Sequence, residues 1–122
     1  MSKVFILEPV RSKLDVSKAR EYGEIIYIFQ RDARRCSVWD HKNFSLTVLR
    51  RLKALGYNYK TDFICVVGAI LTVTIAIIAL TQKYEEFNAL FFNSVSGDYV
   101  KRNFVRKEIE HEIENDATTI TT

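Results

Sequence analysis

The chain has 122 residues, of which 48% are hydrophobic and 27% are charged, and its formal net charge is +3. This length predicts one domain, and the balance of residues excludes both a disordered chain and a strongly basic protein that follows a long nucleic acid. The charge is uneven, because residues 1–60 hold thirteen Lys/Arg and six Asp/Glu, whereas residues 61–122 hold five and nine. A basic half favours an anionic partner.

The first thirty residues predict two short strands. Residues 3–7 and 24–29 are runs rich in β-branched and aromatic side chains, and Pro9 ends the first run because proline cannot continue a central ladder. Between them, residues 17–22 predict one helical turn. The run at 24–29 is apolar on both faces, so we expect this strand to lie in the centre of the sheet.

A long loop and an amphipathic helix are expected next. Residues 30–43 predict a loop of about fourteen residues, a length that is uncommon in compact domains and is often functional. Residues 44–55 repeat apolar side chains every three to four positions, which predicts a helix with one buried face. Asn43 or Asp40 can cap its start, and Gly56 is placed to take the left-handed conformation at its end.

Residues 63–80 form an uncharged, mostly apolar stretch of eighteen residues, around which the rest of the chain is arranged. Its length reaches the lower limit for a transmembrane helix, so a single-span membrane protein is one interpretation. The favoured interpretation is a buried strand over residues 63–67, followed by a buried helix from Ala69 to about Lys83. Gly68 stands between them, where a residue without a Cβ allows a sharp turn.

The helix from Ala69 to Lys83 is apolar on nearly every face and therefore needs a cover on more than one side. Thr72, Ala76, Ala79 and Lys83 make a narrow face of small or polar residues that permits close approach of another helix. We expect this face to pack against its copy in a homodimer or a higher homo-oligomer. The alternative is that the first helix or a loop covers it within the subunit.

The last third of the chain predicts a β-hairpin and a tail. Residues 87–93 and 99–106 are the two strands, joined by a turn over 94–98. The expected fold is α/β, a mixed sheet of about five strands with two helices packed on one face, as a single domain over residues 1–107. Residues 108–122 are acidic and then threonine-rich, and we expect a frayed tail, with the alternative that Ile109 and Ile113 extend a helix by a turn or two.

The sequence offers little catalytic or metal-binding chemistry. The four glycines are not clustered, so no phosphate loop is expected. Cys36, His41, Cys65 and His111 lack the spacing of a metal site, and no cofactor or metal is expected. Cys36 and His41 are five residues apart without an orienting group, so we interpret them as an ordinary cysteine and a surface histidine. Cys65, in a buried strand, is expected to be a core thiol, and the protein is not expected to be an enzyme.

Arginines beside aromatic residues are the chemistry that the sequence does contain. Arginine forks match phosphate oxygens, aromatic faces stack on bases, and an asparagine can hydrogen-bond a base or a ribose. Solvated arginines and core aromatics are the alternative interpretation. The expected phosphate contacts are Arg11, Arg34, Arg35, Lys101, Arg102 and Arg106, the expected stacking residues are Trp39, Phe91 or Tyr99, and the expected hydrogen-bonding residue is Asn93.

Four segments carry a resemblance to a known family. They are KVFILEPVRSKLDV at the start, RRCSVWD in the loop, DFICVVGA before the apolar helix and LFFNSVSGDYVKR in the hairpin. Together they resemble the Thoeris anti-defence protein 1 family of phages over residues 3 to about 106. The resemblance implies an α/β protein that forms dimers and larger assemblies, and that binds cyclic ADP-ribose-type immune signals, or cyclic oligonucleotides, without cleaving them. No binding residue is carried over from the family.

The sequence is therefore interpreted as a viral protein of the host cytoplasm that sequesters a small anionic nucleotide and has no membrane partner. One alternative is a small protein-interaction inhibitor that docks on a host protein through its basic half. The other is the single-span membrane protein, with its N-terminal part held in the cytoplasm by the excess of Lys/Arg.

Overall fold

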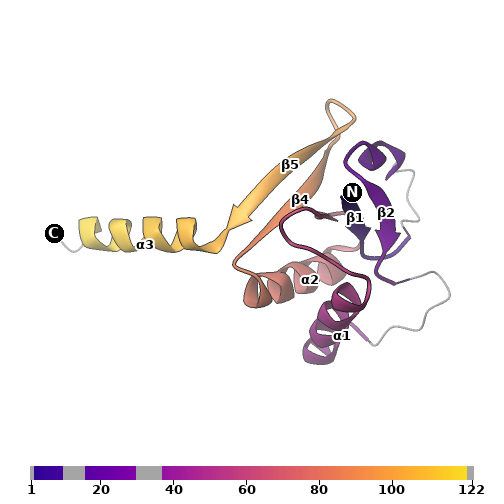
Figure 1. Cartoon of the computed structure of the whole chain (residues 1–122). Coiled ribbons are helices and arrows are strands. Elements are labelled where there is room, and N and C mark those ends of the chain that lie inside the picture. The colour runs from indigo at the N-terminus through magenta and orange to yellow at the C-terminus, as the bar shows by residue number, and fades with distance from the viewer. Residues whose placement is uncertain (1, 10–15, 30–36, 121–122) are drawn as a thin grey trace.

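The structure, a computed structural model, describes residues 2–9, 16–29 and 37–120. The elements are β1 (Lys3–Ile6), the 3₁₀ helix η1 (Val16–Glu21), β2 (Glu24–Tyr27), α1 (His41–Ala54), β3 (Phe63–Cys65), α2 (Ile70–Lys83), β4 (Glu86–Asn93), β5 (Asp98–Val105) and α3 (Arg106–Ile120). Figure 1 shows them along the chain.

The five strands form one mixed sheet in the order β2-β1-β3-β4-β5. Parallel pairing joins β1 to β2, β1 to β3 and β3 to β4, whereas β4 and β5 form an antiparallel hairpin of eight residue pairs. The elements between the parallel strands are η1, α1 and α2, as expected where strands need a crossover connection. The structure confirms the expected α/β fold.

The position expected for the second strand is wrong, because β2 lies at an edge of the sheet. Its apolar character has another cause. Ile28 and Phe29, which follow β2 and are each 2% exposed, belong to the core under α1, where the Phe29 ring stacks on Phe44 with centroids 5.7 Å apart. β2 itself is apolar on both faces because each face of the sheet carries a core, with Ile26 on the α1 and α2 side and Ile25 on the η1 side.

The central apolar stretch is a strand, a glycine turn and a helix, as expected. β3 is buried on both faces, Gly68 has a φ of 129°, and α2 begins two residues later at Ile70. A φ of this sign is unfavourable for residues with a Cβ, which explains the glycine. Within the described part of the chain, every helix is too short or too polar to cross a bilayer.

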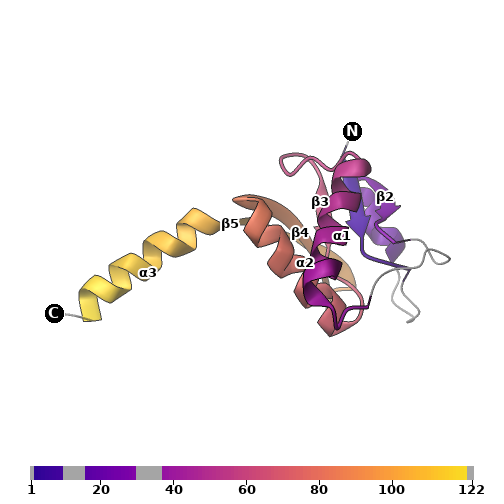
Figure 2. The ribbon, with the colours of Figure 1, turned by 90° about the horizontal axis from the view of Figure 1, so that it is seen from below.

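Both α1 and α2 pack on one face of the sheet and against each other (Figure 2). The small-residue face of α2 is turned inward, because Thr72, Ala76 and Ala79 are 3%, 4% and 1% exposed. This face is therefore covered within the subunit, and the expectation that it meets a second copy is corrected. The opposite face of the sheet carries a second core, in which Ala19 of η1 packs with strand residues such as Val4 and Leu90.

Two caps define α1 and lengthen it relative to the sequence-based expectation. The Asp40 carboxylate accepts a hydrogen bond from the Asn43 N–H, so Asp40 is the N-cap and α1 starts at His41. At the other end, the Gly56 N–H donates to the Lys53 carbonyl and the Tyr57 N–H to the Leu52 carbonyl. This pair of bonds is a Schellman motif, which the φ of 80° at Gly56 permits.

The expectation of a frayed tail from residue 108 differs from the structure, in which α3 extends β5 without a linker and runs to Ile120. The segment is rich in glutamate and other good helix formers, and Arg106 pairs with Glu110 one turn later, at 3.6 Å. Figures 1 and 2 both show α3 projecting away from the sheet and from α1 and α2. The structure is thus a compact α/β body with a helical arm, the name used below for α3.

Candidate functional site

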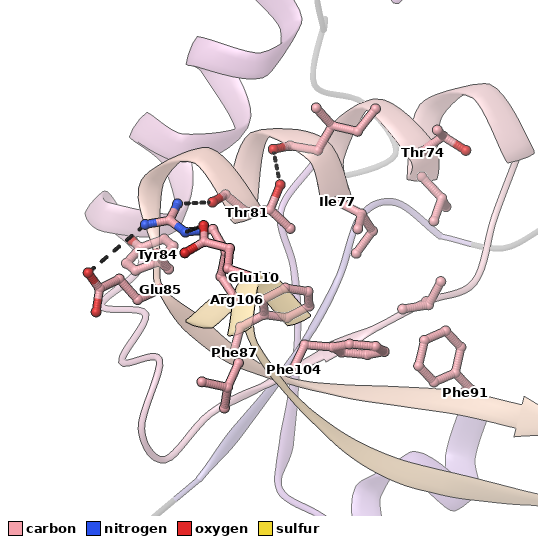
Figure 3. A pocket seen from close by; sticks show the side chains of 14 residues that line it. Thr74, Ile77, Thr81, Tyr84, Glu85, Phe87, Phe91, Phe104, Arg106 and Glu110 are labelled. Atoms are coloured by element: carbon pink, nitrogen blue, oxygen red, sulfur yellow. Dashed lines mark hydrogen bonds and ion pairs between the residues drawn. The ribbon is translucent and has the colours of Figure 1, made fainter. Parts of the chain in front are cut away.

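A groove of about 460 Å³ lies between α2 and the β4–β5 hairpin (Figure 3). It is called the α2–hairpin groove below. Its walls are mainly apolar, with side chains from α2 on one side and aromatic rings from the two strands on the other. The residues that shape these walls are Val73, Ile77, Phe87, Phe91 and Phe104.

The groove lies where α2 faces the hairpin without filling the space between them. β4 pairs with β3 over three residues but with β5 over eight, so the hairpin extends beyond its pairing with the rest of the sheet, and α2 residues from Val73 to Thr81 line the groove opposite its aromatic rings. Phe91 and Phe104 are consequently 37% and 38% exposed. Their rings meet edge to face with centroids 6.0 Å apart, and Phe104 also stacks on Phe87 with centroids 5.5 Å apart. These contacts give the floor of the groove a fixed shape.

A charged cluster closes the end of the groove where α3 begins. The Arg106 guanidinium donates from Nη1 to the Thr81 carbonyl at 2.7 Å, and it lies 4.0 Å from a Glu85 oxygen and 3.6 Å from a Glu110 oxygen. Lys107 Nζ is 3.6 Å from the other Glu85 oxygen. These pairs are largely exposed, so each stabilises the fold by at most about 1 kcal/mol. Their main effect is to fix the direction of the arm.

The structure places Phe91, Asn93, Arg102 and Arg106 on the groove face of the hairpin. The register pairs Phe91 with Val100 and Ala89 with Arg102, and side chains alternate along each strand. Asn93 has a structural role there, because its side-chain oxygen accepts hydrogen bonds from the Val95 and Ser96 N–H groups in the turn.

Tyr99 and Lys101 lie on the opposite face of the sheet, away from the groove. Tyr99 is 5% exposed and packs against Phe92, so its expected role of stacking on a ligand is corrected. The Lys101 ammonium lies 5.5 Å from the centre of the Phe63 ring. The alternation of side chains along β5 separates these two residues from Arg102 and Arg106.

The remaining expected residues do not join this site in the described structure. Trp39 is 82% exposed in the segment before α1, where its backbone N–H donates to the Ser37 hydroxyl, and it is not part of the groove. Arg11, Arg34 and Arg35 lie outside the described residues. The structure therefore brings together Phe91, Arg102 and Arg106, but not the full set of arginines and aromatics.

Sequence reasoning missed the apolar part of the site. Phe104 lies two residues after Arg102 on the same side of β5, and Phe87 lies four residues before Phe91 on the same side of β4. Three phenylalanines on one face of the hairpin are the sequence signal for this apolar surface. The contribution of α2 could not be read from sequence, because that helix is apolar on nearly every side.

The thiol of Cys65 is not in an environment that would activate it as a nucleophile. Cys65 is a free, buried cysteine, and burial raises the pKa of its thiol to about 12, an effect that a hydrogen bond with Tyr99 partly offsets. The thiol is therefore protonated at neutral pH, as expected for a core residue. Among the residues that the structure describes, no group of three or more His, Cys, Asp or Glu side chains is arranged to hold a metal ion.

The comparisons with known proteins place the chain in a phage family. The family model for the Phage Pam3 gp32-like protein matches residues 2–105, which comprise the whole body and end immediately before the arm. No curated protein and no solved structure matches the chain. The match supports a phage protein but not the Thoeris anti-defence protein 1 family in particular. Since it spans more than half of the sequence, the chain belongs to the family of Phage Pam3 gp32-like proteins.

Proposed function

We propose that this phage protein is a non-catalytic binding protein that holds an apolar segment of a protein partner in the α2–hairpin groove. The observation that carries the proposal is the groove itself, a cavity of about 460 Å³ with aromatic walls. Its size lies within the range of ligand sites, and partly exposed apolar surface of this kind marks binding sites. Phe91 and Phe104 are the anchors, since each exposes more than a third of its surface there.

The charges at the groove favour an apolar segment over a phosphate. Arg106 is the basic residue among those that line the groove, and Glu85 and Glu110 already face its guanidinium. A phosphate that approached Arg106 would meet both carboxylates at similar range, and like charges at this distance repel. An apolar helix or strand has no such conflict and would bury the exposed rings.

A second candidate function is sequestration of a cyclic nucleotide immune signal, of the cyclic ADP-ribose type or a cyclic oligonucleotide, without cleavage. The observation that favours it is the placement of Phe91 and Arg102 on the same face of adjacent strands. The Arg102 side chain is exposed, and its Nη1 donates to the neighbouring Lys101 carbonyl at 2.7 Å. An aromatic ring beside an exposed guanidinium can stack on a base and contact a phosphate.

Site-specific photo-cross-linking tests the first function. A benzophenone amino acid replaces Phe91 in the groove or, as the control, Val95 in the hairpin turn, which is 95% exposed and does not line the groove. The expected result during phage infection is a polypeptide adduct from position 91 in at least tenfold excess over position 95, with the cross-linked peptide identified by mass spectrometry. Equal yields at the two positions would contradict a groove-directed partner.

A thermal-shift panel decides between the two functions. Cyclic ADP-ribose isomers, cyclic dinucleotides and cyclic trinucleotides are added to the purified chain and to an Arg102→Ala variant. A nucleotide at 100 times its dissociation constant would stabilise the folded chain by about 2.7 kcal/mol. A shift that Arg102→Ala removes, with the nucleotide recovered intact, would establish sequestration, and the absence of any shift would leave the protein-binding function.

A further inference from the structure

The arm is a helix without a cover. It has 15 residues, and both views show it standing clear of the body (Figures 1 and 2). Ile113 on the arm is 61% exposed. A helix of this length is marginal in water unless it packs on something. The uncovered helix and its exposed isoleucine are therefore accessible to a second molecule.

The arm cannot turn back into the groove of its own subunit without breaking the contacts at its base. No residue separates Val105 at the end of β5 from Arg106 at the start of the arm. The Arg106 N–H donates to the Glu85 carbonyl at 2.8 Å, and the Arg106 side chain is held by Thr81 and Glu110 (Figure 3). Arg106 and Glu110 of the arm lie at the end of the groove, and beyond them the junction directs the arm away from the groove, where a second molecule can reach it.

We propose that the α2–hairpin groove of one copy receives the arm of a second copy, in a symmetric dimer that exchanges two arms. The proposal rests on the proposed function and names the partner in the groove. A helix laid in an apolar groove is a recurring mode of recognition, and a symmetric pair repeats the contact twice. At a rise of about 1.5 Å per residue, the 15-residue arm is about 22 Å long, enough to extend across a neighbouring subunit.

Charge complementarity favours a second copy as the occupant. Residues 106–120 carry two Lys/Arg and five Asp/Glu, whereas residues 1–105 carry sixteen Lys/Arg and ten Asp/Glu. An acidic arm and a basic body attract each other between copies. The carboxylates of Glu85 and Glu110 lie at the end of the groove beside Arg106, whereas Arg102 lies four residues back along the hairpin. Arg102, exposed on the groove face of β5, therefore provides a cation for an arm glutamate such as Glu112 away from those carboxylates.

Two single substitutions test the exchange. Ile113→Asp places a charge on the arm, and Phe91→Asp places one in the groove, whereas Val95→Asp adds the same charge at the hairpin turn as a control. The mass of each purified full-length chain is measured by light scattering after size exclusion, with circular dichroism as the check of folding. We expect a dimer of twice 14.2 kDa for the wild type and Val95→Asp, and a dimer dissociation constant at least tenfold higher for the other two.

Mixing the two defective variants gives the decisive readout. The Ile113→Asp chain keeps an intact groove and the Phe91→Asp chain keeps an intact arm, so their mixture restores one of the two contacts. We expect hetero-dimers in the mixture at concentrations where neither variant dimerises alone.

If Phe91→Asp fails to fold, the substitution at the exposed Ile113 tests the exchange by itself. The exchange is overturned if the wild type stays monomeric even when its concentration in the light-scattering measurement is raised 100-fold. It is also overturned if the Ile113→Asp chain dimerises like the wild type. A monomer that still cross-links another protein through position 91 retains the proposed function.

Discussion

At the residue scale, Tyr57 carries a buried polar group. Its hydroxyl has no hydrogen-bond partner among the described residues. Its ring packs edge to face on Phe5 and Tyr84 at 5.4 Å and 5.3 Å. Burial, with smaller contributions from Tyr84 and Asp62, raises the pKa of Tyr57. The ring thus stabilises the core, whereas the hydroxyl opposes that effect.

Tyr57→Phe is therefore expected to raise the free energy of unfolding by about 1 kcal/mol, because it removes a buried polar group and keeps the ring. Tyr22→Phe is the matched comparison with the opposite sign. The Tyr22 hydroxyl donates to the Tyr99 carbonyl at 3.1 Å, so its loss should lower the free energy of unfolding by about 1 kcal/mol. Urea unfolding measures both, and a destabilised Tyr57→Phe chain would show that the hydroxyl has a partner.

At the element scale, the sequence predicts elements well where a local signal exists. Asp40 and Gly56 bound α1, and Gly68 separates β3 from α2, because capping and turn chemistry depend on adjacent residues. Two predictions failed where the cause lies far away in sequence. The edge position of β2 depends on strand order, and the inward small face of α2 depends on where α1 packs.

The end of α1 gives a prediction at this scale. Gly56 takes a φ of 80° so that the last carbonyls of the helix are bonded. A Cβ there is strained, so Gly56→Ala is expected to lower the free energy of unfolding by about 1 kcal/mol. Gly56→Asn should lose less, because asparagine tolerates this conformation better. Thermal and urea unfolding should rank the stability of the three chains as Gly56 above Gly56→Asn above Gly56→Ala. An alanine variant as stable as the wild type would contradict the role of the left-handed cap.

At the scale of the whole molecule, the candidate site could be predicted only in part. Alternation along β5 puts Arg102 and Phe104 on one side, which the sequence shows directly, whereas Arg106 reaches the groove as the first residue of α3. The groove, however, depends on how α2 packs beside the hairpin, and the arm needs β5 to continue into α3 without a turn. Neither property has a local sequence signal. Tyr99 is close to Arg102 in sequence, but because side chains alternate along β5 it faces the core on the other side of the sheet.

The two faces of the sheet each contain a group whose ionisation opposes folding. Cys65 lies in the core on the η1 side, and its pKa is about 12, whereas Tyr57 packs against the core on the α1 and α2 side, and its pKa is also raised. Each group keeps its proton in the folded chain and loses it in the unfolded chain at a lower pH. The unfolded state then binds fewer protons, so the free energy of unfolding falls as the pH rises.

Between pH 8.5 and 10.5, Cys65 alone should lower the free energy of unfolding by roughly 2 kcal/mol, since an unfolded thiol has a pKa of about 8.5. Cys65→Ala should flatten the curve in this range, and Tyr57→Phe should flatten it above about pH 10, where an unfolded tyrosine ionises. Because the two residues belong to cores on opposite faces of the sheet, the double variant should show the sum of the two effects. Urea unfolding at half-unit pH steps measures these slopes. If Cys65→Ala and the wild type lose stability equally, the Cys65 thiol ionises within the folded protein and its site is open to water.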